Sequence, residues 1–179
     1  AGQLSLPLLA VLGFVGAMGT VGYSVAAPAL LPVLVPAADL ADIERFFSEM
    51  TPAHLTRMGD VYSPDAWFKD PFNEVQGVDA VRGIFQHMYD SLNQPRFIVT
   101  ARVVQGHQCF LTWDFVFGIR GQSSEITVRG ASHLWLAPGT DGRWRIERHR
   151  DYWDVAEELY EKLPLLGGLM RWLKRRANT

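Results

Sequence analysis

The stretch Tyr62–Leu92 places the strongest constraint on what this chain can fold into. It contains a short alternating run, Trp67–Asp70, which is typical of a strand. Pro71 ends that run, because proline has no N–H for the hydrogen-bond ladder of a sheet. A loop then closes at Gly77, and apolar residues recur at helical spacing at positions 81, 84, 85, 88 and 92. The stretch therefore predicts a strand, a loop and an amphipathic helix in that order.

Asp70 stands at the end of the predicted strand, between Phe68 and Phe72. Burial among apolar side chains raises the pKa of a carboxyl group toward the range in which it accepts a proton usefully near neutral pH. Asp70 is therefore a candidate general base. In the alternative interpretation, Asp70 caps the loop turn or pairs with Arg82 or Lys69, and the residues alone leave both open.

Two helices are predicted before this stretch and four strands after it. The first helix begins at Asp39, and Thr51-Pro52 predicts a second, short helix with an N-cap followed by proline. From Arg96 the apolar period changes to two, which predicts strands over residues 96–105, 108–119, 125–137 and 143–153. Helices grouped before an antiparallel meander indicate an α+β domain rather than a wound α/β domain.

Composition excludes several function classes. The net charge of −2 argues against a nucleic-acid partner, which would need a basic surplus. The lone cysteine, Cys109, provides neither a disulfide nor a pair of metal ligands. The chain has no HExxH, CxxC, phosphate-binding loop or GxSxG motif, so we expect no metal and no cofactor.

The two ends of the chain differ from the middle. Residues 1–38 carry no charge, and residues 8–27 are long enough to span a bilayer as a helix, although glycines and prolines interrupt them. This arm is interpreted either as a membrane-contacting segment or as an arm that packs on the domain or on a partner subunit. Residues 155–179 predict a helical tail, in which residues 164–176 form a basic amphipathic helix. The tail either lies on a membrane or covers its own domain, so the expected location is the cytoplasm, with or without membrane association.

The order of predicted elements over residues 39–154 resembles the nuclear transport factor 2-like superfamily, which includes SnoaL-like polyketide cyclases and ketosteroid isomerases. Two local motifs carry the resemblance: residues 65–71 (DAWFKDP) with Gly77 and the helix after it, and the closing strand 148–154 (RHRDYWD). The resemblance is closest to SnoaL-like proteins of bacteria. It implies a cone-shaped, curved antiparallel sheet packed on N-terminal helices (a cystatin-like fold), a cavity for a ligand and a homodimer.

The resemblance also implies roles for individual residues. Asp70 falls where ketosteroid isomerases keep their general base, but Phe46 and Ser132 replace the two oxyanion donors of those enzymes. Losing even one such donor costs about 10²–10³ in rate, so steroid isomerisation is not expected. Asp151 matches the aspartate of the SnoaL-like cyclases, with His149 on the same face of the strand.

Which face of the closing strand lines the cavity is left open. The turn at residues 138–142 predicts that Asp151 and His149 lie opposite Arg129 and Ala131, and apolar parity alone favours an inward face made of Ile126, Val128, Leu134, Leu136 and Ile146. The family resemblance instead favours His149, Asp151 and Trp153 on the inside. A bulge of one residue would exchange the two faces, because side chains alternate along a strand.

Two functional hypotheses follow. In the first, the domain binds a small apolar organic molecule and carries out cofactor-free proton transfer of the isomerase or cyclase type. Its catalytic residues are Asp70, His149 and Asp151, and its substrate-binding residues are Phe46, Phe68, Phe85, Ser132, His133 and Trp153. In the second, the domain is a non-catalytic, dimeric interaction module that attaches to a membrane or a larger complex through its two ends.

Overall fold

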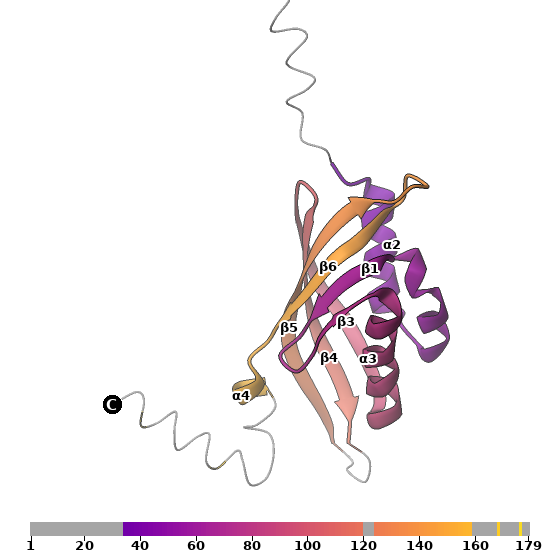
Figure 1. Cartoon of the computed structure of the whole chain (residues 1–179). Coiled ribbons are helices and arrows are strands. Elements are labelled where there is room, and N and C mark those ends of the chain that lie inside the picture. The colour runs from indigo at the N-terminus through magenta and orange to yellow at the C-terminus, as the bar shows by residue number, and fades with distance from the viewer. Residues whose placement is uncertain (1–33, 120–123, 159–167, 169–175, 177–179) are drawn as a thin grey trace, which may run out of the picture. The chain divides into compact units, whose positions relative to one another are not determined.

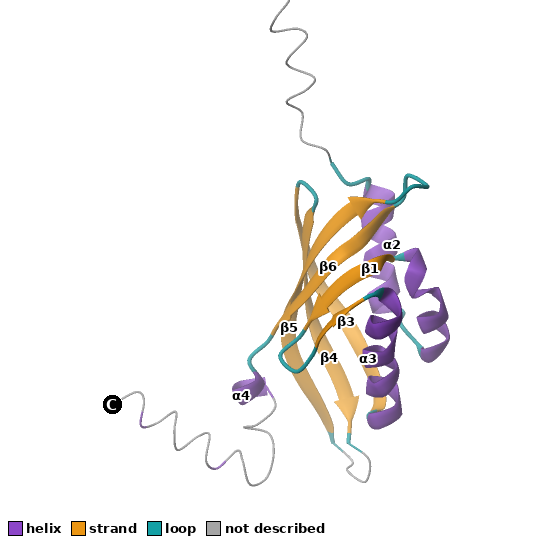
Figure 2. Cartoon of the chain, in the orientation of Figure 1, coloured by secondary structure: helices purple, strands orange, loops and turns teal. Residues whose placement is uncertain are grey.

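A curved sheet with helices on one side forms the domain (Figures 1 and 2). The structure is a computed structural model that describes residues 34–119, 124–158, 168 and 176. In chain order the elements are α2 (Ala37–Ser48), the 3₁₀ helix η2 (Pro52–Asp60), β1 (Tyr62–Lys69), β2 (Glu74–Gln76), α3 (Val78–Ser91), β3 (Asn93–Gln105), β4 (Gln108–Gly118), β5 (Glu125–Pro138), β6 (Trp144–Tyr152) and α4 (Val155–Glu158). The α+β class predicted from the sequence is confirmed.

The helices form close to the predicted positions. Thr51 occupies the position before η2 with extended backbone, but its hydroxyl bonds to His54 Nδ1 (2.9 Å) rather than to a backbone N–H. Gly77 precedes α3 with φ of 94°, a conformation that glycine adopts without strain. Val81 and Phe85 on the apolar face of α3 are buried, because that face packs against the sheet.

The sheet is mixed, with the strand order β2-β1-β6-β5-β4-β3. β3 to β6 form the expected antiparallel meander. β1 pairs in parallel with β6, and β2, which the sequence analysis did not predict, pairs with β1. The chain therefore runs from β1 through β2 and α3 to the far edge of the sheet before returning to β6. As a result, the ends of β1 and β6, which carry Asp70 and Asp151, lie at the same end of the sheet.

The pairing of β5 with β6 differs from the predicted register. His149 lies opposite Leu134 and Asp151 opposite Ser132, not opposite Ala131 and Arg129. The register shifts between Trp135 and Leu136, which leaves Glu147 of β6 without a partner on β5. This one-residue bulge lets residues on both sides of it point inward, since it resets the alternation of side chains.

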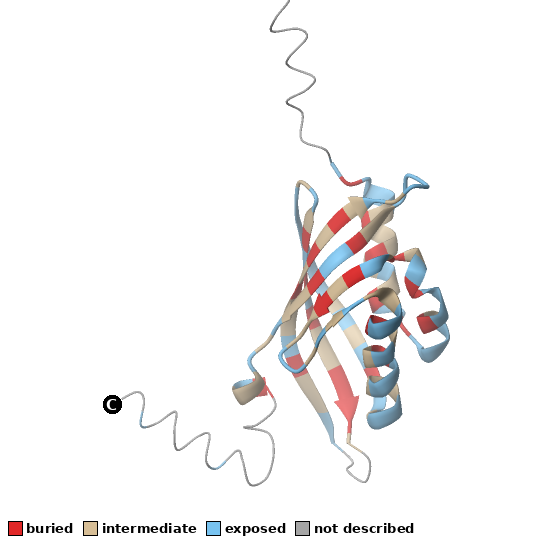
Figure 3. Cartoon of the chain, viewed as in Figure 1, coloured by how far each residue is buried: buried red, intermediate tan, exposed pale blue. Residues whose placement is uncertain are grey.

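The core lies between the helices and the inner face of the sheet. A first cluster joins the apolar sides of α2, η2 and α3 to inward-facing strand residues such as Leu111, Leu134 and Ile146. A second, smaller cluster contains Trp113, Phe117 and Val128 on β4 and β5. Figure 3 shows buried residues alternating with exposed ones along the strands, as expected for a sheet with only one covered face.

Most of the two ends lies outside the described residues, so the predictions made for them are not tested. This applies to residues 1–33 of the uncharged arm, to nearly all of the tail after Glu158 and to the turn at 120–123. Of the arm, Leu34 is exposed and Val35 is buried. Within the described parts of the chain, no helix has the length and apolar character needed to cross a membrane.

Candidate functional site

His149 lies at the centre of a buried polar network inside the sheet. It is 1% exposed and packs edge-on against the rings of Phe47 and Phe68, with centroids 5.7 and 4.9 Å away. Its Nδ1 lies 2.6 Å from the hydroxyl of Tyr62, and its Nε2 lies 2.7 Å from Asp151 Oδ1 and 3.0 Å from Ser132 Oγ. Both ring nitrogens therefore have protein partners, so His149 is held in one orientation.

Asp151 lies at the end of this network and reaches toward solvent. Its Oδ1 accepts a hydrogen bond from the hydroxyl of Ser132 (2.5 Å), which itself accepts one from Trp113 Nε1 (2.9 Å). The side chain of Asp151 is 15% exposed, compared with 2% for that of His149. Among the described residues, no hydrogen bond involves Asp151 Oδ2. The arrangement thus fixes one carboxylate oxygen and leaves the other available for an incoming molecule.

The hollow beneath Asp151 is much smaller than the sequence analysis expected. Aromatic and aliphatic side chains fill the interior and leave about 10 Å³ beside His149, Ser132 and Asp151. That volume accommodates about one water molecule. Among the described residues, this hollow is too small for an organic ligand, because the side chains of Phe85, Phe97 and Trp113 pack around it.

A larger, open groove lies on the other side of Asp151. It has a volume of about 580 Å³ and is lined by the ends of the parallel strands β1 and β6: Lys69, Asp70, Pro71, Arg150, Asp151, Tyr152, Trp153 and Asp154. The indole of Trp153 meets the exposed ring of Phe72 edge-on at 5.5 Å. Trp153 also packs against the second core cluster. Asp151 is the one residue that lines both the interior hollow and this groove.

Asp70 faces the same groove, but its carboxylate holds the turn that follows β1. Its Oδ1 accepts hydrogen bonds from the backbone N–H groups of Phe72 (2.7 Å) and Asn73 (2.5 Å) and from Asn73 Nδ2 (3.1 Å). Its Oδ2 accepts a further bond from Asn73 Nδ2 (2.9 Å). Lys69 pairs instead with Glu74, and Arg82 with Asp79. The geometry matches the turn-capping alternative, because both oxygens of Asp70 are engaged within the turn.

The predicted substrate-binding residues divide between four places, and one of them, Trp153, lines the groove. Phe85 and Ser132 line the interior hollow, and Phe68 packs between Phe85 and His149. His133 points to the opposite face of the sheet, where its ring stacks on Phe110 at 3.9 Å. Burial, and then the nearby charge of Arg148, lower the pKa of His133 from its usual value.

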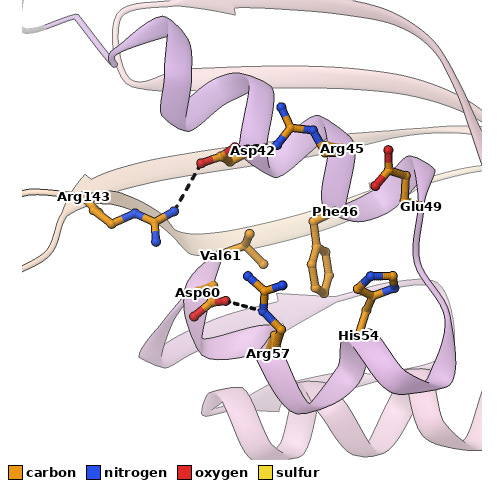
Figure 4. Close-up of a pocket in the computed structure, with 9 residues that line it drawn as sticks. All are labelled: Asp42, Arg45, Phe46, Glu49, His54, Arg57, Asp60, Val61 and Arg143. Carbon is orange, nitrogen blue, oxygen red and sulfur yellow. Dashed lines mark hydrogen bonds and ion pairs between the residues drawn. The ribbon is translucent and has the colours of Figure 1, made fainter.

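Phe46 lies outside the interior, in a separate surface pocket of about 160 Å³ between α2 and η2 (Figure 4). The rim of that pocket is charged: Arg57 pairs with Asp60 at 2.9 Å, and Arg143 with Asp42 at 3.3 Å. The family resemblance aligns Phe46 with a tyrosine that donates to the oxyanion. Phe46 does not line the hollow beside His149.

The sequence analysis missed two members of the network, Tyr62 and Trp113. Tyr62 enters it only as the first residue of the stretch that leads to Asp70, and Trp113 is assigned no role. A signal was present in both cases, because a tyrosine or tryptophan in a buried strand normally needs a partner for its O–H or N–H. Which partner it finds depends on the parallel pairing of β1 with β6, which no local pattern indicates.

Metal ligation has no support in the described residues, where no group of three or more His, Cys, Asp or Glu side chains is placed to hold an ion. The polar groups of the interior bond instead to one another. Across the described residues, every buried side-chain nitrogen and oxygen has a hydrogen-bond partner. The network is therefore complete as built from protein side chains.

Comparison with known proteins places this geometry in context. The sequence model of the SnoaL-like domain family matches residues 43–147 of the chain. A protein of ketosteroid isomerase-like fold from Catenulispora acidiphila, solved in complex with trimethylamine, is 16% identical; the match covers 70% of this chain and 91% of that one, with a TM-score of 0.55. TsrD from Streptomyces laurentii is 17% identical, with 74% and 98% covered and a TM-score of 0.56.

A candidate SnoaL-like polyketide cyclase from Jannaschia sp. CCS1 is 15% identical to the chain, with 66% of this chain and 87% of that one covered and a TM-score of 0.55. No curated protein is significantly similar to the chain. At these identities the solved structures are evidence of a shared fold only. They confirm the resemblance that the order of helices and strands predicted.

Proposed function

The chain belongs to the SnoaL-like domain family, and from that membership we propose that it binds a small, mostly apolar organic molecule and exchanges a proton with it through Asp151. The reaction is of the isomerase or cyclase type and needs no cofactor. A positioned carboxylate is sufficient to abstract a proton next to a carbonyl group, provided that the resulting negative charge is accommodated.

One observation carries this proposal: Asp151 separates the interior network from the open groove. Its Oδ1 is held by Ser132 and His149, no hydrogen bond among the described residues involves its Oδ2, and its side chain lines the groove. A base fixed by hydrogen bonds on one oxygen requires little reorganisation when it reacts. Asp70 shares the groove, but the turn uses both of its oxygens, so Asp151 is assigned as the base and Asp70 as a structural residue.

The ligand binds in the groove rather than in the interior. A hollow of about 10 Å³ does not admit an organic molecule, whereas the groove of about 580 Å³ offers the ring of Trp153 as an apolar wall. Phe72, which contacts Trp153 and is exposed, extends that wall. Arg150, which also lines the groove, supplies positive charge for a polar end of the ligand.

The same geometry limits the substrate. Ser132 and His149 already donate toward Asp151, so neither is free to act as a strong oxyanion donor. Without such donors a weakly acidic carbon is not deprotonated at a useful rate. The substrate class that fits is therefore an activated one, such as a 1,3-dicarbonyl compound, whose anion is already delocalised.

The test is hydrogen–deuterium exchange at the activated carbon of a panel of small 1,3-dicarbonyl compounds, followed by proton NMR in D₂O. Wild-type protein is expected to accelerate the exchange of at least one compound, and Asp151→Asn to lower that rate by about 10² or more. Asp114→Asn is the matched control, because Asp114 lies on the other face of the sheet beside Arg129. Equal rates for wild type and Asp151→Asn, or no acceleration by wild type, would contradict the proposal.

The second candidate, a dimeric interaction module, is favoured by a different observation. The face of β3 and β4 that the helices leave uncovered carries exposed apolar side chains, including Ile98, Val103 and Phe110. Apolar side chains gathered on one face mark interaction sites more often than isolated ones do. A second copy of the chain is the proposed occupant. Sedimentation analysis of the oligomeric state tests this candidate independently of any turnover.

A further inference from the structure

Tyr62 is the largest polar side chain in the interior that neither the family resemblance nor the proposed reaction uses. It opens β1 and is completely buried. Its ring lies nearly parallel to that of His149, with centroids 6.0 Å apart and an angle of 15° between the planes. Among the described residues, the one hydrogen-bond partner of its hydroxyl is His149 Nδ1, at 2.6 Å.

The direction of that hydrogen bond follows from the other partner of the imidazole: the carboxylate oxygen of Asp151 accepts at Nε2, so Nε2 carries a proton, and Nδ1 of a neutral ring then accepts from the Tyr62 hydroxyl. Burial, and then the negative charge of Asp151, raise the pKa of Tyr62 well above its usual value, so the phenol keeps its proton. A neutral imidazole has one acceptor nitrogen and one N–H. With the Tyr62 hydroxyl donating to Nδ1, the proton of the neutral ring is on Nε2, which faces Asp151 Oδ1 at 2.7 Å.

We propose that Tyr62 is a positioning residue that fixes His149 as an Nε2–H donor, so that two donor chains converge on Oδ1 of Asp151 and direct its Oδ2 to the groove. One chain runs from Tyr62 through His149. The other runs from Trp113 Nε1 through the hydroxyl of Ser132. The effect of Tyr62 on catalysis rests on the proposed function. The tautomer of His149 does not depend on that function.

The position of Tyr62 makes it suited to this task. β1 is joined to β6 in parallel, with Tyr62 opposite Ile146 and Phe68 opposite His149. The phenol thus reaches His149 from the neighbouring strand, on the side away from the groove. A substituent of the groove ligand cannot displace it there, because Tyr62 and His149 are both buried. Tyr62 therefore acts on Asp151 only through the imidazole.

The first measurement is the tautomer of His149, read from long-range ¹H–¹⁵N correlation spectra of the full chain labelled at histidine. His149 is assigned by replacing the four other histidines, His54, His87, His107 and His133, one at a time. We expect a protonated Nε2 and an unprotonated Nδ1 at neutral pH. An Nδ1–H tautomer, or a ring protonated on both nitrogens, would overturn the proposal, and wild-type protein with Tyr62 intact gives this result.

The second measurement compares Tyr62→Phe with Tyr89→Phe. Tyr89 is a matched control, because its hydroxyl also makes a single hydrogen bond. It donates to the carbonyl oxygen of Met50 (2.7 Å), and its ring is partly buried. Tyr62→Phe leaves Nδ1 without its donor, so we expect signals of a second tautomer or ring orientation for His149. Tyr89→Phe is expected to leave the His149 signals unchanged. Identical His149 spectra for wild type and Tyr62→Phe would overturn the positioning role.

Turnover separates this inference from the proposed function. If wild type exchanges a 1,3-dicarbonyl proton, Tyr62→Phe is expected to lower kcat about tenfold with KM unchanged, because an orienting partner is lost while the groove stays intact. An unchanged kcat beside an altered tautomer would overturn the catalytic consequence. If wild type exchanges nothing, the proposed function fails, and the spectra alone decide whether Tyr62 fixes His149.

Discussion

Asp70 and Asp151 show how hydrogen bonding distinguishes two aspartates that line one groove. Asp70 directly follows β1, and Asp151 lies near the end of β6, which pairs with β1 in parallel. Asp70 accepts bonds on both oxygens from the turn at Phe72 and Asn73, whereas Asp151 accepts on one oxygen only. The motif DAWFKDP was sufficient to single out Asp70 and to suggest two roles for it. It did not decide between them, because the choice depends on the conformation of three residues after Pro71.

The assignment of Asp70 to the turn predicts a loss of stability rather than of activity. Asp70→Ala removes the acceptor of two backbone N–H groups and is expected to lower the free energy of unfolding by about 1–2 kcal/mol. Urea unfolding followed by tryptophan fluorescence measures this. Asp70→Asn, which keeps one acceptor oxygen, should recover part of the loss. Asp65→Ala is the control on the same strand, because its side chain is exposed.

Deuterium exchange completes the test of Asp70. Folded Asp70→Asn is expected to retain the exchange rate of wild type, because the carboxylate that reacts belongs to Asp151. A variant of Asp70 that is as stable as wild type but loses exchange by about 10² would restore Asp70 as the base and contradict its assignment to the turn.

At the scale of elements, the bulge in β6 decides which side chains form the site. The sequence left two inward faces open for β6, one with Ile146 and one with His149. Both residues are buried, although they are three residues apart. Strict alternation places residues that are three apart on opposite faces. Local apolar periodicity predicted β1 and the four strands of the meander, but it could not locate one unpaired residue. The bulge is visible only in the pairing with Trp135 and Leu136 of β5.

The bulge predicts opposite outcomes for two deletions of equal length. Without Glu147, Ile146 and His149 are separated by one residue, and regular alternation keeps both on the inside. Deleting Glu147 should therefore leave the chain folded, with His149 still bonded to Asp151. Deleting Arg150 moves Asp151 to the outer face, which leaves Ser132 and His149 without their shared acceptor. That loss is expected to cost about 2 kcal/mol or more.

Chemical unfolding of both deletion variants, with Glu147→Ala and Arg150→Ala as controls of unchanged length, measures the difference. The two substitutions should each remain within about 0.5 kcal/mol of wild type if exposed or partly exposed side chains carry little energy there. Equal destabilisation by the two deletions would mean that the bulge itself, rather than the direction of the side chains, stabilises β6.

At the scale of the whole molecule, the two faces of the sheet have different tasks. The helices cover the inner face (Figure 2). Aromatic side chains between them and the sheet leave a hollow of only about 10 Å³ beside His149. Of the site residues named from the sequence, Phe85, Ser132, His149 and Asp151 line the interior hollow, whereas its volume depends on the rotamers of Phe85, Phe97 and Trp113, which no sequence pattern gives. Among the described residues, α2, η2 and α3 lie on the inner side of the sheet, and outer side chains of β3 and β4, such as Val103 and Phe110, are exposed.

The outer face carries the last prediction, that the chain is a dimer in solution and that Phe110 lies at its interface. Val103, Phe110 and His133 are paired across β3, β4 and β5, and the first two are 64% and 40% exposed. Phe110→Asp places a charge in the middle of this row, where burial against a second copy would leave it unpaired at a cost of several kcal/mol. We expect sedimentation equilibrium to show a dimer for wild type and a monomer for Phe110→Asp. Leu34→Asp introduces the same charge at an exposed apolar residue outside the sheet and should remain dimeric. A monomeric wild type would contradict the interface. The Asp151 site would then be tested by deuterium exchange alone.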